Sequence, residues 1–308
     1  MRPCLVDALA AGVVVLDGGL STELEAAGHD VSTSLWSARL LCDDPDAVVG
    51  AHRRFFAAGA RVATTASYQA SAEGFSSLGL DRAQADALIA SSVALAARAR
   101  SEAGLDDQAW VAASVGPYGA VRADGSEYTG AYVDPMDVAV LRRFHRPRLE
   151  LLATAGADVL ACETLPAAAE VEALLLELEV LDVPAWVSLT ISVDVDGVAR
   201  TRRGEPAAEV FAMLADARSL IAVGVNCLDP RGVTAAVRAA ASAGKPVVAY
   251  ANSGEQWDAA QRIWTGHGSS TWTEVDAWIG AGARLVGGCC RVGPAQIADL
   301  AGRVAAEH

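Results

Sequence analysis

Three cysteines in the second half of the chain have the clearest potential for chemistry. Cys289 and Cys290 are adjacent and follow two glycines in ARLVGGCC, and Cys227 ends the segment IAVGVNC. Thiolates are soft ligands that suit zinc, and three of them leave a fourth coordination position open, as in catalytic zinc sites. The same residues would also fit as buried thiols without a metal, because free cysteine packs as a small apolar residue. The pattern alone leaves both interpretations open.

A zinc ion held by three thiolates would have a narrow chemistry. Its site carries net negative charge, so it is a poor generator of hydroxide but a good site for a fourth sulfur. A free thiol has a pKa of about 8.5, whereas a coordinated thiol is deprotonated outright. The predicted reaction is nucleophilic displacement by a substrate thiolate. Methyl transfer from a sulfonium fits, since the leaving thioether is neutral and needs no acid.

Elements far apart in the sequence must bring these cysteines together. Eight short apolar or β-branched runs recur along the chain, as expected of parallel strands covered on both faces. Helical segments lie between most of them, most clearly at 81–104, 166–179 and 294–307. The eight runs span residues 12–19, 60–68, 110–117, 157–165, 185–192, 221–227, 246–254 and 283–290.

This alternation predicts an α/β fold, a single (β/α)8 TIM barrel that forms one domain over residues 1–308. A doubly wound open sheet is the alternative. It loses support because no GxGxxG follows a strand and no GxxxxGK[ST] occurs.

In a TIM barrel the chemistry gathers at the C-terminal ends of the strands. Cys227 ends the sixth predicted strand and Cys289 and Cys290 end the eighth, so their thiols can converge over one mouth. Successive side chains on a regular strand point to opposite faces. We therefore expect Gly287 and Gly288 to supply the backbone freedom that turns both thiols toward the barrel axis.

Other strand ends carry groups that suit an amino-acid thiol as substrate. Asp17 and Glu163 offer carboxylates for an α-ammonium group. The backbone N–H groups after Asp17, at Gly18 and Gly19, and the Thr65 hydroxyl can take a carboxylate. A single aspartate before two glycines is also a common turn residue. The predicted substrate-binding residues are Asp17, Gly18, Thr65, Glu163 and, at the end of the seventh strand, Asn252.

Two long loops leave the same predicted face, and aromatic rings in them could attract a sulfonium cation by its charge. Ordinary loop packing is the alternative for each ring. His267 in the second loop could be a ligand, although the glycines around it favour a turn. The aromatic residues are Tyr118, Tyr128 and Tyr132 in the loop 114–135, and Trp257, Trp264 and Trp272 in the loop 252–272.

The sequence closely resembles the zinc-dependent homocysteine S-methyltransferases, and within them the S-methylmethionine-using branch. GVNC and GGCC are specific to the wider family, and GPYGA, ADGSEY and HRPR indicate the branch. The resemblance runs from residue 16 to residue 291. The stretches that carry it are LDGGLSTELEAAG, SLWSARLL, TASYQAS, SVGPYGA, ADGSEYTGAY, FHRPRLE, LACETLP, GVNC, ANSGE and ARLVGGCCR.

The resemblance implies a (β/α)8 barrel with Zn2+ and with homocysteine as methyl acceptor and methionine as product. The donor would be S-methylmethionine, with S-adenosylmethionine a poorer donor; other members of the family use betaine or methylate selenocysteine. Gln69 stands where the betaine-using branch has a tyrosine that is the resting metal ligand. The implied ligands are Cys227, Cys289 and Cys290 for zinc, and Asp17, Gly18, Thr65 and Glu163 for homocysteine.

Composition and charge exclude other classes. A formal net charge of -14 argues against a nucleic-acid partner. No run approaches the roughly 20 apolar residues of a membrane span, and Asp7 interrupts the early apolar stretch, so we expect a cytoplasmic protein without a signal peptide. No protein partner is implied.

A Schiff-base aldolase is nearly excluded, because the single lysine, Lys245, lies at the start of the seventh strand, at the end opposite the expected site. A non-catalytic zinc or redox sensor, with a disulfide between the adjacent thiols, remains as the alternative.

Overall fold

The computed structural model describes residues 2–33, 35–258, 263–266, 268 and 272–306. Its main sheet has eight parallel strands in the order β1-β12-β9-β8-β5-β4-β3-β2. A parallel bridge from Leu16 to Val62 joins the two end strands. The strands are β1 (Val14–Val15), β2 (Val62–Thr64), β3 (Trp110–Val115), β4 (Val159–Leu165), β5 (Ala185–Leu189), β8 (Leu220–Asn226), β9 (Val247–Ala251) and β12 (Ala283–Gly288).

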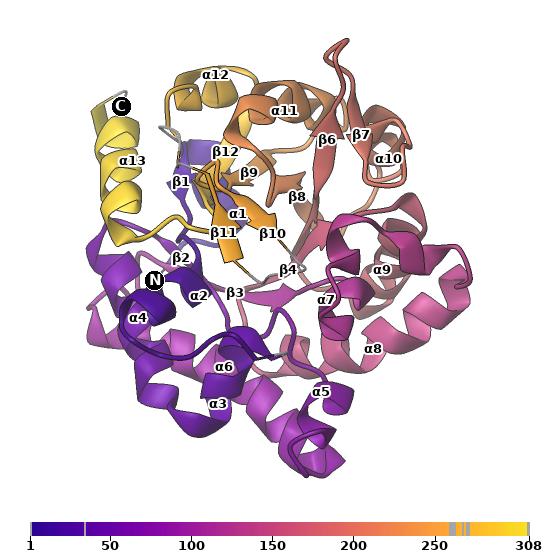
Figure 1. Ribbon diagram of the computed structural model, residues 1–308. Helices are drawn as coiled ribbons and strands as arrows, with labels where there is room; N and C mark the ends of the chain where they lie inside the picture. The colour runs from indigo at the N-terminus through magenta and orange to yellow at the C-terminus, as the bar shows by residue number, and fades with distance from the viewer. Residues whose placement is uncertain (1, 34, 259–262, 267, 269–271, 307–308) are drawn as a thin grey trace.

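Helices surround the strands, and two antiparallel hairpins are added to the barrel (Figure 1). The hairpins are β6 (Ile191–Val193) with β7 (Ala199–Thr201), and β10 (Gln256–Asp258) with β11 (Ile263–Thr265). The α-helices are α1 (Leu5–Ala11), α2 (Leu20–Ala26), α3 (Leu40–Asp43), α4 (Pro45–Ala57), α5 (Ala72–Ser76), α6 (Arg82–Glu102), α7 (Tyr118–Arg122), α8 (Val138–Thr154), α9 (Ala168–Leu181), α10 (Ala207–Ala212), α11 (Val233–Ala241), α12 (Val275–Gly280) and α13 (Pro294–Ala306). The 3-10 turns in the described residues are η1 (Trp36–Arg39), η2 (Ser126–Tyr128), η3 (Ala131–Val133) and η4 (Pro230–Gly232).

The apolar residues divide into an outer and an inner core. The larger cluster lies between strands and helices, and a second cluster fills the barrel interior with residues such as Trp110, Trp186 and Leu285. Leu5 and Leu9 of α1 belong to the inner cluster, so this short helix packs against the barrel interior. Within the described residues, no helix is long and apolar enough to cross a membrane.

The architecture confirms the predicted (β/α)8 barrel and excludes the open-sheet alternative. Each of the eight predicted runs contains or overlaps one barrel strand, and α6, α9 and α13 occupy the three predicted helical segments. Several runs are longer than their strands, and one of them contains residues of a second strand. Residues 185–192 divide after Leu189, and Ile191 already belongs to the hairpin strand β6.

The two glycines before the cysteine pair serve a different purpose from the predicted one. Neither Gly287 nor Gly288 has a positive φ. Instead they leave room for close packing, because a Cβ on Gly287 would lie 2.4 Å from the Cβ of Leu16, and one on Gly288 would lie 2.2 Å from a methyl of Val292. The requirement is therefore for the absence of a side chain, and the conformational freedom of glycine is not used.

We expect Gly287→Ala to lower the free energy of unfolding by about 1–3 kcal/mol, because the added methyl must displace β1 from β12. Urea unfolding curves measure the change. The control is Gly302→Ala in α13, where the new Cβ would meet nothing within 4 Å outside its own helix backbone. The higher helix propensity of alanine should stabilise the protein there by up to about 1 kcal/mol. Equal stability of Gly287→Ala and the wild type would contradict the close packing.

Candidate active site at the mouth of the barrel

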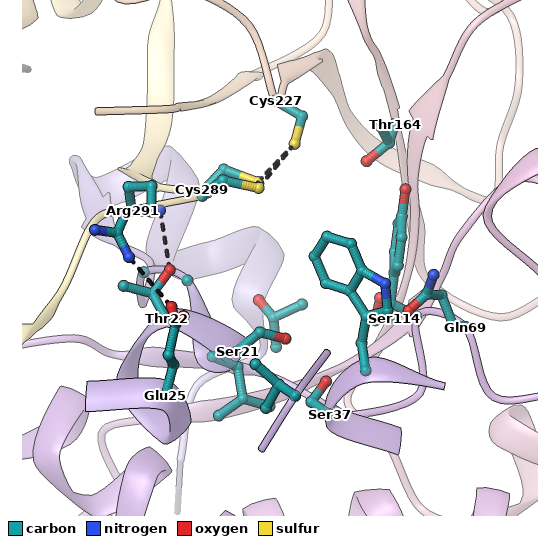
Figure 2. Close-up of a pocket in the computed structure, with 18 of the residues that line it drawn as sticks. Ser21, Thr22, Glu25, Ser37, Gln69, Ser114, Thr164, Cys227, Cys289 and Arg291 are labelled. Carbon is teal, nitrogen blue, oxygen red and sulfur yellow. Dashed lines mark hydrogen bonds and ion pairs between the residues drawn. The ribbon is translucent and has the colours of Figure 1, made fainter. Parts of the chain in front are cut away.

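The three predicted cysteines meet at the C-terminal end of the barrel. The Sγ atom of Cys227 lies 3.1 Å from that of Cys289 and 3.5 Å from that of Cys290, and the Cys289 and Cys290 sulfurs are 3.9 Å apart. Figure 2 shows the sulfurs of Cys227 and Cys289 turned toward each other. All three thiols are free, and these separations far exceed the about 2.05 Å of a disulfide bond.

This arrangement fits a zinc ion. Zn–S bonds of about 2.3 Å in tetrahedral geometry put ligand sulfurs about 3.8 Å apart, close to the spacing observed between these thiols. Among the residues described, this trio is the one group of histidine, cysteine and acidic side chains whose ligand atoms all lie within 4.8 Å of one another. Hydrogen bonds from Cys227 and Cys289 hold the pKa of Cys290 well below its usual range, whereas the pKa values of Cys227 and Cys289 are raised, so without a metal the negative charge of the group rests on Cys290.

The irregular backbone at two strand ends aims these thiols. Cys227 directly follows β8 and has a φ of 55°, in the left-handed region that L-residues rarely adopt. Its N–H still donates to the Tyr250 carbonyl at 3.1 Å, and its own carbonyl accepts from the Thr190 hydroxyl at 3.2 Å. Cys289 is held by a 2.7 Å hydrogen bond from its N–H to the Ala251 carbonyl. The sulfur positions are thus fixed by backbone contacts to neighbouring strands.

Asn252 supports the thiol group and does not face the substrate space. Its side-chain Oδ1 accepts from the Cys290 N–H at 3.1 Å, and its own N–H donates to the Leu228 carbonyl at 3.0 Å. It is not among the residues that line the cavity beside the thiols. The structure thus shows Asn252 positioning Cys290, and substrate binding by Asn252 stays a prediction.

A cavity of about 430 Å³ lies against the three sulfurs and has room for more than one amino-acid-sized ligand. Its walls come from the ends of the barrel strands and from the segment that includes α2 and η1, with Ser21, Thr22 and Ser37 on that side (Figure 2). Its described lining includes five carboxylates and one arginine, and that arginine, Arg291, is paired with Glu25 and Glu255. The cavity therefore favours a cationic ligand.

Asp17 lies in this cavity as predicted and is almost fully buried. It accepts hydrogen bonds from the backbone N–H of Thr64 at 2.7 Å and from the Thr64 hydroxyl at 2.9 Å. Burial raises its pKa to about 8 despite these two hydrogen bonds, and the nearby charge of Glu163 adds to the rise. An incoming ammonium group would give the ionised Asp17 carboxylate a positively charged partner.

Glu163 lies in the same cavity, at the fifth residue of β4. Its two oxygens accept from the Ser114 hydroxyl and, at 2.8 Å, from the Tyr250 hydroxyl. Burial raises its pKa to about 7, and those hydrogen bonds oppose the rise. The structure therefore brings together the two carboxylates that the sequence analysis assigned to an α-ammonium group.

The raised pKa of Asp17 predicts a pH-dependent stability of the metal-free, ligand-free protein. A folded-state pKa of about 8, against 3.8 for the free side chain, means that the neutral acid is favoured on folding. The contribution of neutral Asp17 to the free energy of unfolding is complete below the unfolded pKa of 3.8. It is lost as the pH rises through the folded pKa of about 8. We expect the stability of Asp17→Asn relative to the wild type to increase between about pH 5 and pH 8. Urea unfolding at several pH values measures this, and a constant difference would contradict it.

Gly18 and Thr65 also line the cavity, and the hydrogen bonds of Thr65 limit what its hydroxyl can donate. A Cβ on Gly18 would lie 2.4 Å from the Val292 carbonyl oxygen, so this position requires glycine, and the N–H of Gly19 is already bonded to that oxygen. Ser67 donates to the Ser114 carbonyl, so the Thr65 hydroxyl must donate to Ser67 at 2.7 Å. In this arrangement the Thr65 proton is used by Ser67 and its oxygen also accepts from the Ser114 N–H at 3.0 Å, so binding of a substrate carboxylate by Thr65 stays a prediction.

The predicted aromatic residues separate into cavity and core residues. Tyr128 lines the cavity, and its hydroxyl lies 3.5 Å from the Cys227 sulfur. Tyr118 packs on Phe144, Tyr132 donates to Glu170, and Trp272 packs against Trp278, so these three are structural. The predictions for His267 and for the Trp257 and Trp264 side chains lie outside what the structure describes.

Sequence reasoning missed several cavity residues. Tyr68, Trp36 and Thr164 contribute to the walls, and so does Glu127, a buried carboxylate next to Tyr128. The signals were present, since Tyr68 ends the second predicted strand and Glu127 lies in ADGSEY. Gln69 also lines the cavity, and its side-chain N–H group donates to the Ala120 carbonyl at 2.9 Å.

The fold and the site define a (β/α)8 barrel with a three-thiol centre at the mouth, and comparisons with known proteins agree. The family model described as homocysteine S-methyltransferase matches residues 14–304. The chain is 45% identical over 301 residues to the homocysteine S-methyltransferase of Escherichia coli, covering 94% of this chain and 95% of that protein. It is 41% identical to the homocysteine S-methyltransferase YbgG of Bacillus subtilis, covering 94% and 93%.

A solved structure shares the architecture. The metallated form of the homocysteine methyltransferase MmuM from Escherichia coli superposes with a TM-score of 0.83 at 42% identity, covering 95% of this chain and 96% of that one. The chain therefore belongs to the homocysteine S-methyltransferase family.

Proposed function

We propose that this protein transfers a methyl group from a sulfonium donor, S-methylmethionine, to the thiol of homocysteine and yields methionine. The observation that carries the proposal is one cavity that holds three converging thiols and two buried carboxylates, Asp17 and Glu163. A thiol-bearing amino acid matches both features, with its sulfur toward Cys227, Cys289 and Cys290 and its ammonium toward the carboxylates. Membership of the family supports this acceptor.

We assign the three cysteines as ligands of Zn2+. When bound there, zinc lowers the pKa of a substrate thiol and holds it as a thiolate at neutral pH. Asp17 and Glu163 orient the acceptor by its ammonium group, so that its sulfur faces the thiol centre. Burial of the two carboxylates removes competing water, which strengthens this charge pairing.

Methyl transfer then needs an in-line approach of the donor from the open side of the cavity. The S–CH3 bond of the sulfonium breaks, both electrons stay on the donor sulfur, and the acceptor sulfur forms the new bond. No general acid is required, because the leaving thioether is neutral. The space of about 430 Å³ accommodates donor and acceptor together, as this direct displacement demands.

The test is methionine formation by zinc-loaded protein from homocysteine, with S-methylmethionine, S-adenosylmethionine or betaine supplied separately. We expect the fastest turnover with S-methylmethionine and slower turnover with S-adenosylmethionine. No methionine with any of the three donors, in protein shown to contain zinc, would contradict the proposal and favour the sensor.

We further infer that residues 1–308 act as one domain in the cytoplasm. One continuous parallel sheet draws strands from Val14 to Gly288, which supports a single unit.

A further inference from the structure

Glu127 is a buried carboxylate in the cavity that the acceptor does not use. Its side chain is 4% exposed, and its Oε2 has no hydrogen-bond partner in the part of the chain that the structure describes. An unpaired carboxylate buried in this way costs several kcal/mol unless a positive charge arrives. Burial raises the pKa of Glu127 to about 7, and a hydrogen bond from its own backbone N–H opposes the rise.

The backbone around Glu127 is built to hold it in place. It lies in η2 between Gly125 and Gly130, which both have positive φ. A Cβ on Gly119 would lie 2.6 Å from the Glu127 nitrogen, so the loop closes tightly on α7.

A buried network anchors the same loop from behind. Glu170 on α9 accepts from the Tyr118 N–H at 2.7 Å and from the Tyr132 hydroxyl, and His145 lies 2.8 Å from its Oε1. The backbone of the loop that carries Glu127 is therefore held before any ligand binds, which suits it to a specific contact.

Charge balance indicates what this contact is. Homocysteine brings one ammonium group, which Asp17 and Glu163 share under the proposed function. A sulfonium amino acid brings a further positive charge on its sulfur. Arg291, the arginine among the described lining residues, does not repel this charge strongly, because it is already paired with Glu25 and Glu255. Glu127 is the remaining buried carboxylate on the wall.

The place of Glu127 favours the sulfonium centre over the distant ammonium of the donor. Its neighbour Tyr128 has its hydroxyl 3.5 Å from the Cys227 sulfur, so this wall borders the thiol centre where the methyl group is transferred. The rings of Tyr68 and Tyr128 line the same cavity and add attraction for a cation.

We propose that Glu127 is a specificity-determining residue that binds the sulfonium centre of the methyl donor and distinguishes it from a neutral thioether. This inference rests on the proposed function. This contact would favour binding of the donor over binding of its product, because the donor loses its positive charge when the methyl group leaves. The attraction to Glu127 is then lost and the thioether product is released more readily.

Binding can be measured without turnover by titrating zinc-loaded protein calorimetrically in the absence of homocysteine. The two probes are S-methylmethionine and its carbon isostere, in which a CH group replaces the sulfonium sulfur. The isostere has the same shape and the same amino-acid part, but it has no charge at that position. We expect Glu127→Gln to weaken S-methylmethionine binding by about tenfold or more and to leave isostere binding unchanged.

Controls separate this effect from damage to the site. Asp134→Asn removes the same charge from an exposed position of the same loop, and binding should stay as in the wild type. Glu127→Asp keeps the charge and should retain part of the preference. Bound zinc is measured in each variant to show that the thiol centre is intact.

Two results would overturn the inference: an unchanged preference for S-methylmethionine over the isostere in Glu127→Gln, or an equal loss for both probes, which would place Glu127 on the donor ammonium. The proposed function fails differently, by the absence of methionine formation in the wild type. The two failures are therefore distinguishable.

Discussion

Each of the variants Cys227→Ser, Cys289→Ser and Cys290→Ser should lose zinc and methyl-transfer activity together. Removal of one thiolate leaves two sulfur ligands, and we expect zinc affinity to fall by at least about a hundredfold. The effect should be similar at all three positions, because their sulfurs form one group with separations of 3.1–3.9 Å. Metal content after dialysis against a weak chelator and methionine formation are the two measurements.

Two exposed cysteines supply the controls for this experiment. Cys4→Ser and Cys42→Ser remove exposed thiols that are not among the residues lining the cavity, and both variants should keep full zinc content and activity. Full activity and full zinc content in any one of the three cavity variants would remove that cysteine from the centre. Zinc loss without loss of activity would separate the metal from the reaction.

Replacing Glu163 by glutamine should chiefly weaken homocysteine binding while zinc stays bound. The glutamine keeps the shape and can still accept the Ser114 hydrogen bond, but it cannot supply a charge to the substrate ammonium. Loss of one partner from a buried charge pair costs about 2–5 kcal/mol, so we expect the KM for homocysteine to rise by at least about thirtyfold. Initial rates at varied homocysteine, together with zinc content, measure the effect.

The matched control is Glu172→Gln, an exposed glutamate on α9, which should behave as the wild type. Loss of zinc in Glu163→Gln would give Glu163 a role in the metal centre instead. An unchanged KM would show that Asp17 alone binds the ammonium group.

The sequence was sufficient for the fold and for the identity of the thiol centre. Eight apolar runs with helices between them specify a parallel barrel, because parallel strands must be covered on both faces. A barrel places all strand ends on one face, so Cys227 and the Cys289–Cys290 pair could be predicted to meet although more than 60 residues separate them. The carboxylates Asp17 and Glu163 followed from the same rule.

Tertiary structure alone decided how individual side chains are used. Gly287 and Gly288 were predicted to bend the chain, yet they make room for Leu16 and Val292. The left-handed backbone near the thiols lies instead at Cys227 after β8, with a φ of 55°, and at Arg291 after β12, with a φ of 64°. Asn252 turned out to hold Cys290, since the direction of a side chain beyond a strand end depends on irregular backbone that has no period. The significance of Glu127 required knowing that a carboxylate oxygen is buried without a partner, and burial on a loop is set by contacts that the local sequence does not encode.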